Sequence, residues 1–283
     1  MEIRKVYGLF FSPTGNTEKV VTAIADSLAA DAGYIDITLP GARESVREFA
    51  ADTLVVVGSP VYAGRVPNKM LPYFQSMLKG NGALAVPVVT FGNRNFDNAL
   101  AELRDLLEAD GFHTVAGAAV PCQHAFTEVL APGRPHAEDL RDLEAFAHAI
   151  TKKTAQLDFA PVEAVSVPGD SPATKYYTPM GMDGKPAVFL KTRPETDPDK
   201  CTGCGLCAEV CPMGSIDIAS SSEIAGSANA YTQPKITSIC IKCQSCIEKC
   251  PAQAMYFSDE RFLSHVAMLE HNYTDHSEIR LFL

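Results

Sequence analysis

The 283-residue sequence lacks any apolar stretch of about 18 residues or more, the length that a membrane-spanning helix needs. It also lacks a basic excess, since 24 Lys and Arg stand against 34 Asp and Glu for a formal net charge of −10. A nucleic-acid-binding surface needs a basic face that neutralises phosphates, so the composition argues against that class. An acidic surface is instead compatible with basic protein partners.

The N-terminal residues also show no targeting signal. Residues 1–5 lead into a short apolar run that ends at Ser12 and Pro13. This run is too short for the core of a signal peptide, and no small-residue cleavage site follows it. We therefore expect a cytoplasmic location and no membrane span.

Cysteine is nearly absent outside one segment. Eight of the nine cysteines lie between Cys201 and Cys250, and the ninth is Cys122. In a reducing compartment such a cluster indicates metal binding, and disulfide pairing would leave one cysteine over. Cys122 itself is expected to be a small buried hydrophobic residue. The segment after residue 200 therefore carries a different chemistry from the residues before it.

Apolar runs and helical periodicity alternate through the first half of the chain. Runs typical of strands buried on both faces lie at 6–11, 54–58, 83–91 and 115–120, with a shorter edge strand at 33–39. Helices are expected around 20–28, 68–78, 96–109 and 140–150. The alternation predicts an α/β doubly wound, parallel five-stranded sheet. Ligands bind beyond the carboxyl ends of such strands, which directs attention to the loops after Phe11, Gly58, Phe91 and Val120.

The first of these loops is rich in hydroxyl groups. Ser12-Pro13-Thr14-Gly15-Asn16-Thr17 lies between the first strand and the first helix. Its hydroxyls and the first helical N–H groups can donate to phosphate oxygens, helped by the helix dipole. The loop has no Lys or Arg, so neutral donors would hold the phosphate, which suits a terminal phosphate monoester. The alternative is an ordinary helix N-cap with turn residues.

This loop fits the pattern Ser/Thr-x-Thr-Gly-Asn-Thr, and residues 1–157 resemble the flavodoxins, which bind FMN there. The resemblance implies a flavodoxin-like FMN-binding domain in which the loops at 58–64 and 90–96 flank the isoalloxazine ring. The implied phosphate contacts are Ser12, Thr14, Gly15, Asn16 and Thr17. The implied ring contacts are Ser59, Pro60, Val61, Tyr62, Ala63, Gly92, Asn93, Arg94, Asn95 and Phe96. For Tyr62 and Phe96, simple packing is the alternative to ring contact.

Residues 158–190 form a segment rich in Pro and Gly that reads as a linker. Its aromatic residues Tyr176, Tyr177 and Phe189 suggest that it packs over another part of the protein. The loop before it contains His124, which could face the flavin and move a proton; the alternative is a histidine that is only hydrogen-bonded. The tail, residues 259–283, predicts a helix over 261–273, with His265, His271 and His276 on the surface.

The strongest motif is C-x2-C-x2-C-x3-C-P, which begins at Cys201 and again 39 residues later at Cys240. Zinc is the weaker alternative, since three cysteines in seven residues exceed its usual pattern. Residues 191–258 resemble the bacterial two-cluster ferredoxins, small α+β domains in which the fourth Cys of each run serves the other cluster. The resemblance implies one [4Fe-4S] cluster on Cys201, Cys204, Cys207 and Cys250 and another on Cys240, Cys243, Cys246 and Cys211. Between the runs, an extended loop that includes Ser220–Ser222 is expected.

The combination is similar to the fused flavodoxin–ferredoxin proteins of anaerobic bacteria. It predicts an electron-transfer protein that relays single electrons between two [4Fe-4S] clusters and FMN and on to redox partner proteins with basic docking faces. One alternative is an FMN-dependent reductase of a quinone, nitro compound or enone, with His124 as the proton donor. Another is a redox-sensing interaction module. Transfer between the subunits of a homo-oligomer also stays open.

Arg94 departs from the flavodoxin pattern, because the corresponding loop there tends to be acidic. A cation near the reduced, anionic flavin favours its reduction. We predict that Arg94→Ala lowers the second reduction potential of bound FMN in a redox titration. An unchanged or raised potential would support the alternative, a solvated surface arginine.

Overall fold

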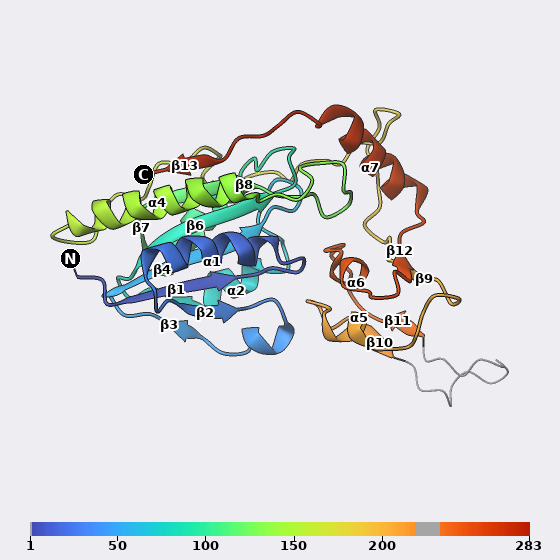
Figure 1. Ribbon diagram of the computed structural model, residues 1–283, viewed down its shortest axis with the longest axis horizontal. Coiled ribbons are helices and arrows are strands. Elements are labelled where there is room, and N and C mark those ends of the chain that lie inside the picture. Colours follow the sequence, from blue (N-terminus) through green and yellow to red (C-terminus); the bar gives the residue numbers. More distant parts are fainter. Residues whose placement is uncertain (1, 219–232) are drawn as a thin grey trace.

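A computed structural model describes residues 2–218 and 233–283 of the chain. An α/β domain occupies one end of the molecule and a smaller cysteine-rich region the other (Figure 1). The expected loop segment Ser220–Ser222 lies outside the described residues. In the described part of the chain, no helix combines the length and the apolar character that crossing a bilayer requires.

The α/β domain is built on parallel strands. β1 (Lys5–Phe10), β2 (Gly33–Asp36), β4 (Thr53–Pro60), β6 (Leu84–Phe91) and β8 (Gly117–Pro121) run parallel in the spatial order β2-β1-β4-β6-β8. Numbered among themselves these strands have the order 2-1-3-4-5, which is that of the flavodoxin-like sheet. The five predicted strands and the predicted fold are therefore confirmed.

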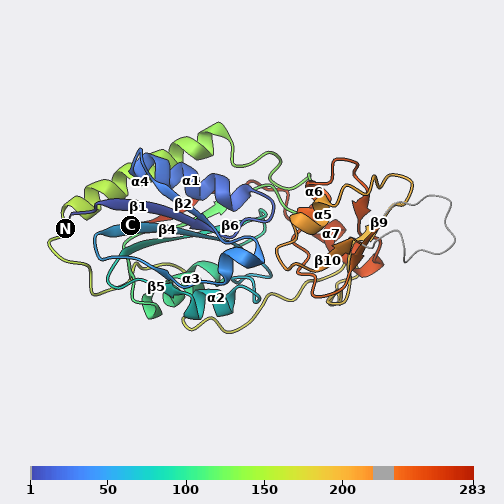
Figure 2. The ribbon, with the colours of Figure 1, turned by 90° about the horizontal axis from the view of Figure 1, so that it is seen from below.

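Helices cover both faces of the sheet (Figure 2). α1 (Asn16–Leu28) and α4 (Ala137–Ala155) lie on one face, and α2 (Leu71–Ser76) and α3 (Ala99–Ala109) on the other. α2 is shorter than predicted because β5 (Leu78–Lys79) leaves it to pair with β3 (Arg47–Glu48) in a separate small sheet. The short elements η1 (Pro40–Arg43) and β7 (His113–Thr114) complete the domain.

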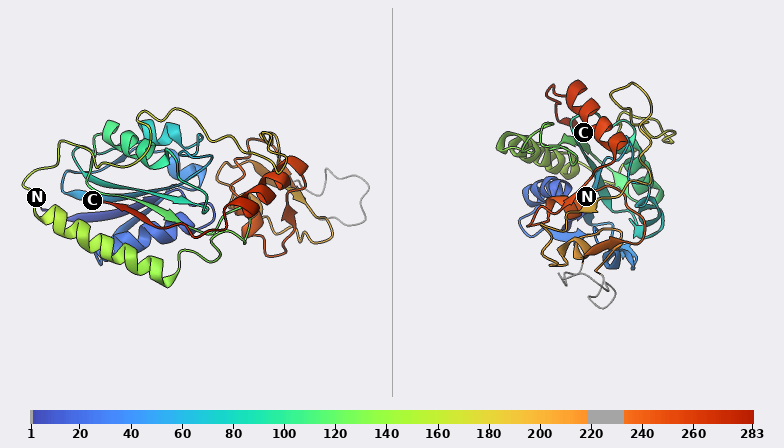
Figure 3. Two further views of the ribbon diagram at one scale, coloured as in Figure 1. Left: turned by 90° about the horizontal axis from the view of Figure 1, so that it is seen from above. Right: turned by 90° about the vertical axis from the view of Figure 1, so that its right-hand side faces the viewer.

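The C-terminal tail adds a strand that the sequence did not predict. After α7 (Glu260–Asn272), which is the expected helix, the chain runs back along the domain and ends in β13 (Arg280–Phe282) (Figure 3). β13 pairs antiparallel with β8 at the sheet edge, with Leu281 opposite Ala118. The tail, expected to be helical, is thus also part of the sheet; three residues are too few for a recognisable period-2 pattern.

The cysteine-rich region repeats its structure at the same interval as its sequence. α5 (Leu206–Glu209) and α6 (Ser245–Glu248) begin 39 residues apart, as do β10 (Ile216–Ile218) and β12 (Met255–Tyr256), and β9 (Glu195–Thr196) and β11 (Pro234–Ile236). β9 pairs with β12, and β10 with β11. The two repeats therefore interlock, because β9 of the first repeat pairs with β12 of the second.

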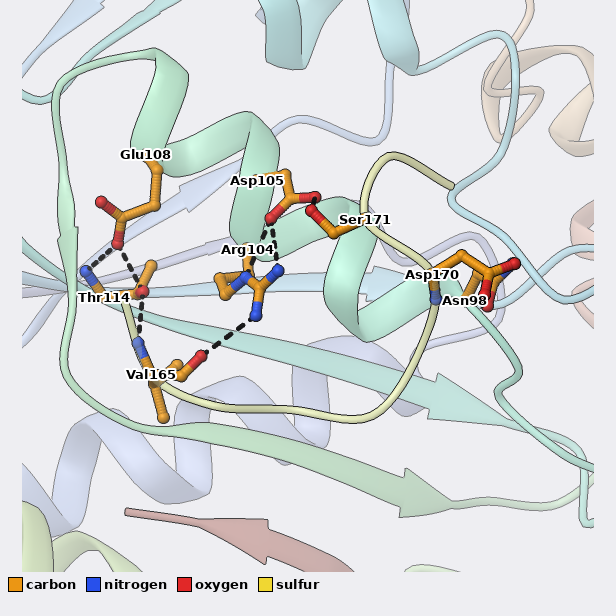
Figure 4. A network of polar contacts seen from close by, with 8 residues as sticks. All are labelled: Asn98, Arg104, Asp105, Glu108, Thr114, Val165, Asp170 and Ser171. Carbon is orange, nitrogen blue, oxygen red and sulfur yellow. Dashed lines mark hydrogen bonds and ion pairs between the residues drawn. The ribbon is translucent and has the colours of Figure 1, made fainter. Parts of the chain in front are cut away.

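Residues of the linker are held against the α/β domain by polar contacts (Figure 4). The N–H of Val165 donates to the carbonyl oxygen of Thr114, at 3.2 Å, and its carbonyl accepts from Arg104, at 3.3 Å. Further along, the Ser171 hydroxyl donates to the Asp105 carboxylate at 2.5 Å. These contacts tie the linker to β7 and α3 before it turns toward the cysteine-rich region.

The cysteine-rich region lies beyond the carboxyl ends of the parallel strands in the views of Figures 1 and 2. The Arg43 guanidinium donates to the carbonyls of Ile37 and Thr38 in the α/β domain and, at 2.6 Å, to that of Pro212 in the cysteine-rich region. The rings of Phe126 and Phe262, 4.8 Å apart, join the loop after β8 to α7. The strand ends and the cysteine motifs therefore face each other within one chain.

Gly58 in β4 allows α1 to pack closely on the sheet. A Cβ atom at Gly58 would lie 2.3 Å from a methyl group of Val21 and 2.8 Å from that of Thr17. We predict that Gly58→Ala lowers the free energy of unfolding by about 1–3 kcal/mol through overpacking, as measured by urea denaturation. The control is Gly41→Ala, where a Cβ atom would meet no atom within 4 Å. Equal stabilities of the two variants would contradict this prediction.

Candidate flavin and iron–sulfur site

A cavity of about 240 Å³ lies where the carboxyl ends of β1, β4, β6 and β8 face the cysteine-rich region. Ten of the predicted cofactor contacts line it: Thr14, Asn16, Thr17, Pro60, Val61, Tyr62, Ala63, Gly92, Arg94 and Asn95. The four loops that the sequence pointed to all contribute. This convergence follows from the parallel sheet, whose loops meet at one edge.

The start of α1 presents unpaired donors. Gly15 adopts φ +89°, which favours glycine, and turns the chain into the helix. Among residues 2–218 and 233–283, no acceptor lies within hydrogen-bond reach of the N–H groups of Asn16 and Thr17. The Thr17 hydroxyl lies 2.7 Å from that of Thr90. The residues here fit a phosphate group, because two free N–H groups at a helix N-terminus are its usual partners.

Five of the predicted contacts lie outside the cavity lining. Ser12 is buried, and its hydroxyl accepts from the Glu18 N–H at 2.9 Å, so it caps α1. Gly15 shapes the same turn. Ser59 is buried within β4. Phe96 packs on Phe91 with ring centroids 5.5 Å apart, which is the packing alternative for this residue.

Asn93, the last of these five, anchors the tail instead of facing the cavity. Its side-chain amide donates to the carbonyls of Tyr273 and Asp275 at 2.6 and 2.8 Å. Its own carbonyl oxygen accepts from the hydroxyl of Ser277 at 2.6 Å. It thereby holds the segment between α7 and β13 against the loop that follows β6.

Arg94 lines the cavity and is not a free surface arginine. Its guanidinium pairs with the carboxylate of Asp97 and stacks over the ring of Tyr177, 3.8 Å from the centroid. Tyr177 belongs to the linker, and its N–H donates to the carbonyl of Ala63 at 2.7 Å. Tyr177 and Phe189 of the linker thus line the cavity, in keeping with the expectation that the linker packs over another part of the protein.

His124 also lines the cavity, packed against the loop after β6. A Cβ atom at Gly92 would lie 2.2 Å from the His124 ring, so only glycine leaves room for this contact. Nδ1 of His124 accepts from the N–H of Phe126 at 3.0 Å. Burial, with smaller effects from His265 and Arg94, lowers the pKa of His124 to about 4. His124 is therefore neutral at pH 7.

His265 reaches the cavity from α7, and the expectation that it lies on the surface is wrong. Its side chain is 4% exposed, because it shares the buried face of α7 with Phe262 and Leu269. The helical spacing of these three residues was a signal that could have placed it there. Leu269 itself also lines the cavity.

The second cysteine run borders the same cavity. Ile241, Lys242 and Cys243 are among its lining residues. Burial, together with the neighbouring Cys243 and Glu248, raises the pKa of Tyr62 well above its ordinary value. Tyr62, predicted as a ring contact, thus lies between the strand-end loops and the second cysteine run.

The eight cysteines divide between two further cavities. One is lined by Cys201, Cys204, Cys207 and Cys250, and the other by Cys211, Cys240, Cys243 and Cys246. These are the two crossed sets that the resemblance implied. A backbone N–H contacts a sulfur atom in each: Ser215 to Cys211 at 3.4 Å, and Ala254 to Cys250 at 3.3 Å. Such N–H···S contacts tune iron–sulfur potentials.

The cysteine geometry suits a multi-atom centre. In a cubane each thiolate binds a different iron atom, so the four sulfur atoms need not converge on one point. Each set of four cysteines lines a single cavity. Within residues 2–218 and 233–283, no group of three or more His, Cys, Asp and Glu side chains is placed to hold a single metal ion. Cys122 belongs to neither set; it is buried, as predicted, and burial raises its thiol pKa to about 12.

The low pKa of His124 has a consequence for stability. The unfolded chain, with a histidine pKa of about 6.5, binds this proton more tightly than the folded one, so stability falls as the pH drops from 6.5 toward 4. We predict that urea denaturation shows a larger loss of stability between pH 7.5 and 5 for the wild type than for His124→Gln. The exposed His148→Gln is the control. An identical loss in all three proteins would contradict the assignment.

Comparisons with known proteins agree with this division of the chain. Residues 194–217 and 237–255 each match a family described as 4Fe-4S binding domain. No curated protein matches the chain. Iron–sulfur binding is therefore assigned to the cysteine-rich region.

Solved structures similar to the first half include a flavodoxin from the domain Archaea, with 14% identity, a TM-score of 0.40, and coverage of 54% of this chain and 100% of that one. Oxidised flavodoxin 1 from Bacillus cereus has 17% identity, a TM-score of 0.39, and coverage of 53% and 98%. The fold is assigned from the strand order of the sheet and not from these similarities. The chain has the organisation of a fused flavodoxin–ferredoxin protein, a flavodoxin-like α/β domain followed by two 4Fe-4S binding domains.

Proposed function

We propose that this protein transfers single electrons within one chain, between two [4Fe-4S] clusters and an FMN, and exchanges them with redox partner proteins. The observation that carries the proposal is the cavity lined both by the strand-end loops and by Cys243 of the second cysteine run. Because one chain would hold all the redox groups, electron transfer between them would need no collision between molecules.

The residues around the cavity support FMN as the occupant. Asn16 and Thr17 offer free N–H groups for the phosphate, and Thr14 lines the same end. The loops at 60–64 and 90–95 would hold the ring. FMN accepts one or two electrons, whereas each iron–sulfur cluster carries one, so the pair can convert between single and paired electrons.

The two cysteine sets differ in their relation to this cavity. Cys243, with its neighbours Ile241 and Lys242, lines it, and in the described part of the chain no cysteine of the set Cys201, Cys204, Cys207 and Cys250 does so. The cluster on Cys211, Cys240, Cys243 and Cys246 is therefore the proximal one, and the other is the distal one. Cys204 of the distal set is exposed, which supports the approach of external partners to that cluster. The net charge of −10 favours partners with basic docking faces.

A second candidate, a small-molecule reductase, is favoured by a further cavity. This second cavity has a volume of about 710 Å³ and shares Phe91, Arg94, Asn95 and Tyr177 with the FMN cavity. A small acceptor bound there would be separated from the flavin by the stack of Arg94 on Tyr177. The role of His124 as a proton donor is disfavoured, because its pKa of about 4 leaves the ring as a neutral imidazole at pH 7, which is a much weaker acid than imidazolium. Saturable reduction of a quinone by the photoreduced protein would favour this candidate.

The relay is tested with protein reconstituted anaerobically with iron, sulfide and FMN. In stopped-flow reduction, cluster bleaching should precede flavin reduction at a rate that is independent of protein concentration. Cys211→Ala, which removes a ligand of the proximal cluster, should slow flavin reduction by at least tenfold. Cys250→Ala, the matched change in the distal set, should leave electron transfer from the proximal cluster to FMN within about twofold of wild type.

Three results would overturn the relay. One is a rate proportional to protein concentration, which means transfer between molecules. Another is an equal effect of the two cysteine variants. The third is protein that retains zinc instead of iron, or that binds no flavin after reconstitution.

A further inference from the structure

Two histidines from distant parts of the chain meet at the FMN cavity. His124 lies in the loop after β8, and His265 lies on α7, beyond the cysteine-rich region. Both line the cavity, and they are close enough that the charge of His265 affects His124. Both lie beside the loop after β6, since the His124 ring packs against Gly92 and Arg94 disfavours a positive charge on either histidine.

The hydrogen bonds of the two rings assign opposite tautomers. Nδ1 of His124 accepts from the Phe126 N–H at 3.0 Å, so it carries no hydrogen, and the neutral ring is protonated on Nε2. Nδ1 of His265 lies 2.9 Å from the carbonyl oxygen of Met180, which can only accept, so the hydrogen is on Nδ1 and Nε2 has a free lone pair. His124 thus has a donor left over, and His265 an acceptor.

The surroundings keep both rings neutral. Burial lowers the pKa of each, and the Arg94 guanidinium disfavours a further positive charge on either. Besides Arg94, the ionisable groups that line the cavity in the described part of the chain are Tyr62, Tyr177, Lys242, Cys122 and the cluster ligand Cys243, and none of them is a carboxylate that would stabilise an imidazolium. Ring packing holds the orientations: His124 on Phe126 at 5.1 Å, and His265 on Phe189 at 5.4 Å.

A flavin needs both kinds of partner. In the oxidised ring, the central nitrogen N5 accepts a hydrogen bond. Uptake of two electrons from the iron–sulfur clusters and one proton from solvent forms an N5–H bond, so the same nitrogen becomes a donor. Protein groups that bond to the ring nitrogens tune the flavin in this way.

We propose that His124 and His265 form a donor–acceptor pair for the flavin, in which His124 bonds to the oxidised ring and His265 to the reduced ring. This inference rests on the proposed function, since it requires FMN in the cavity. It makes His265, contributed by the tail, part of the flavin site, and it gives His124 a role that involves no transfer of its own proton. The pair would give the protein similar affinities for oxidised and reduced FMN instead of favouring one of them.

The test measures FMN affinity in both redox states with the full-length, cluster-loaded protein. His124→Phe keeps an aromatic ring but removes the donor, so it should weaken oxidised FMN by about threefold to tenfold and raise the midpoint potential. His265→Phe removes the acceptor, so it should weaken reduced FMN by a similar factor and lower the potential. The exposed His271→Phe, on the same helix, should change neither.

Glutamine variants guard against effects of folding. His124→Gln retains an amide donor and His265→Gln a carbonyl acceptor, so each should recover part of the affinity that the matching phenylalanine variant loses. Iron content and circular dichroism identify any phenylalanine variant that fails to fold. At that position the glutamine variant is then compared with wild type.

The outcomes separate the two proposals. Potentials that shift in opposite directions support the pair, and potentials that shift in the same direction, or not at all, overturn it while leaving the relay intact. Failure of the wild type to bind FMN in either state overturns the proposed function and this inference with it.

Discussion

The convergence of parallel strands at one edge is the constraint on which the rest of this structure depends. Every crossover returns the chain so that the loops after β1, β4, β6 and β8 emerge on the same side. Within the described part of the chain, the backbone N–H groups of Asn16 and Thr17 at the start of α1 lie unpaired at that edge. Because the edge is open, the linker, the cysteine-rich region and α7 can all close over it, and a site typical of a single domain becomes a site shared by the whole chain.

Several contacts hold the other segments of the chain over this edge of the sheet. Arg43 bonds across to the turn after Cys211, Asn93 holds the tail, and β13 returns to the sheet beside β8. The buried pair of Arg134 with Asp139 adds a bond from Arg134 to the Ser277 carbonyl at 2.5 Å. Each contact joins segments far apart in the sequence, so the two redox regions keep a defined separation. Electron transfer requires such geometry, since the protein contributes position and potential rather than bond chemistry.

The same closure sets the electrostatics of the cavity. Burial among aromatic rings and paired polar groups lowers the pKa of His124 and of His265, which favours their neutral forms, and Arg94 is balanced by Asp97. In the cysteine-rich region, burial raises the pKa of several thiols, that of Cys243 to about 12. Iron binding would displace those thiol protons, and each cysteine set is further supported by an N–H···S contact.

The sequence by itself determined the five parallel strands, the helices between them and the 39-residue repeat of the cysteine motif. These features depend on apolar periodicity and on fixed spacings, which are local properties of the chain. Strand ends and the loops after them are likewise readable along the sequence, and the ten cavity residues within those loops were implied by the resemblance to the flavodoxins. The crossed cysteine sets were implied by the resemblance to the bacterial two-cluster ferredoxins, and the two cavities group the cysteines in the same way.

Only the tertiary structure decided which residues outside that pattern join the site. Ser12 caps α1, Asn93 anchors the tail and Phe96 packs on Phe91, because those are the groups within reach of each side chain in the folded chain. The cavity is also lined by His265, Tyr177 and Lys242, and β13 pairs with β8. These contacts form because segments far apart in the sequence pack against the α/β domain. Periodicity reports which face of an element is buried but not which partner buries it. The approach of the second cysteine run to the strand-end loops therefore appeared only once the whole chain was folded.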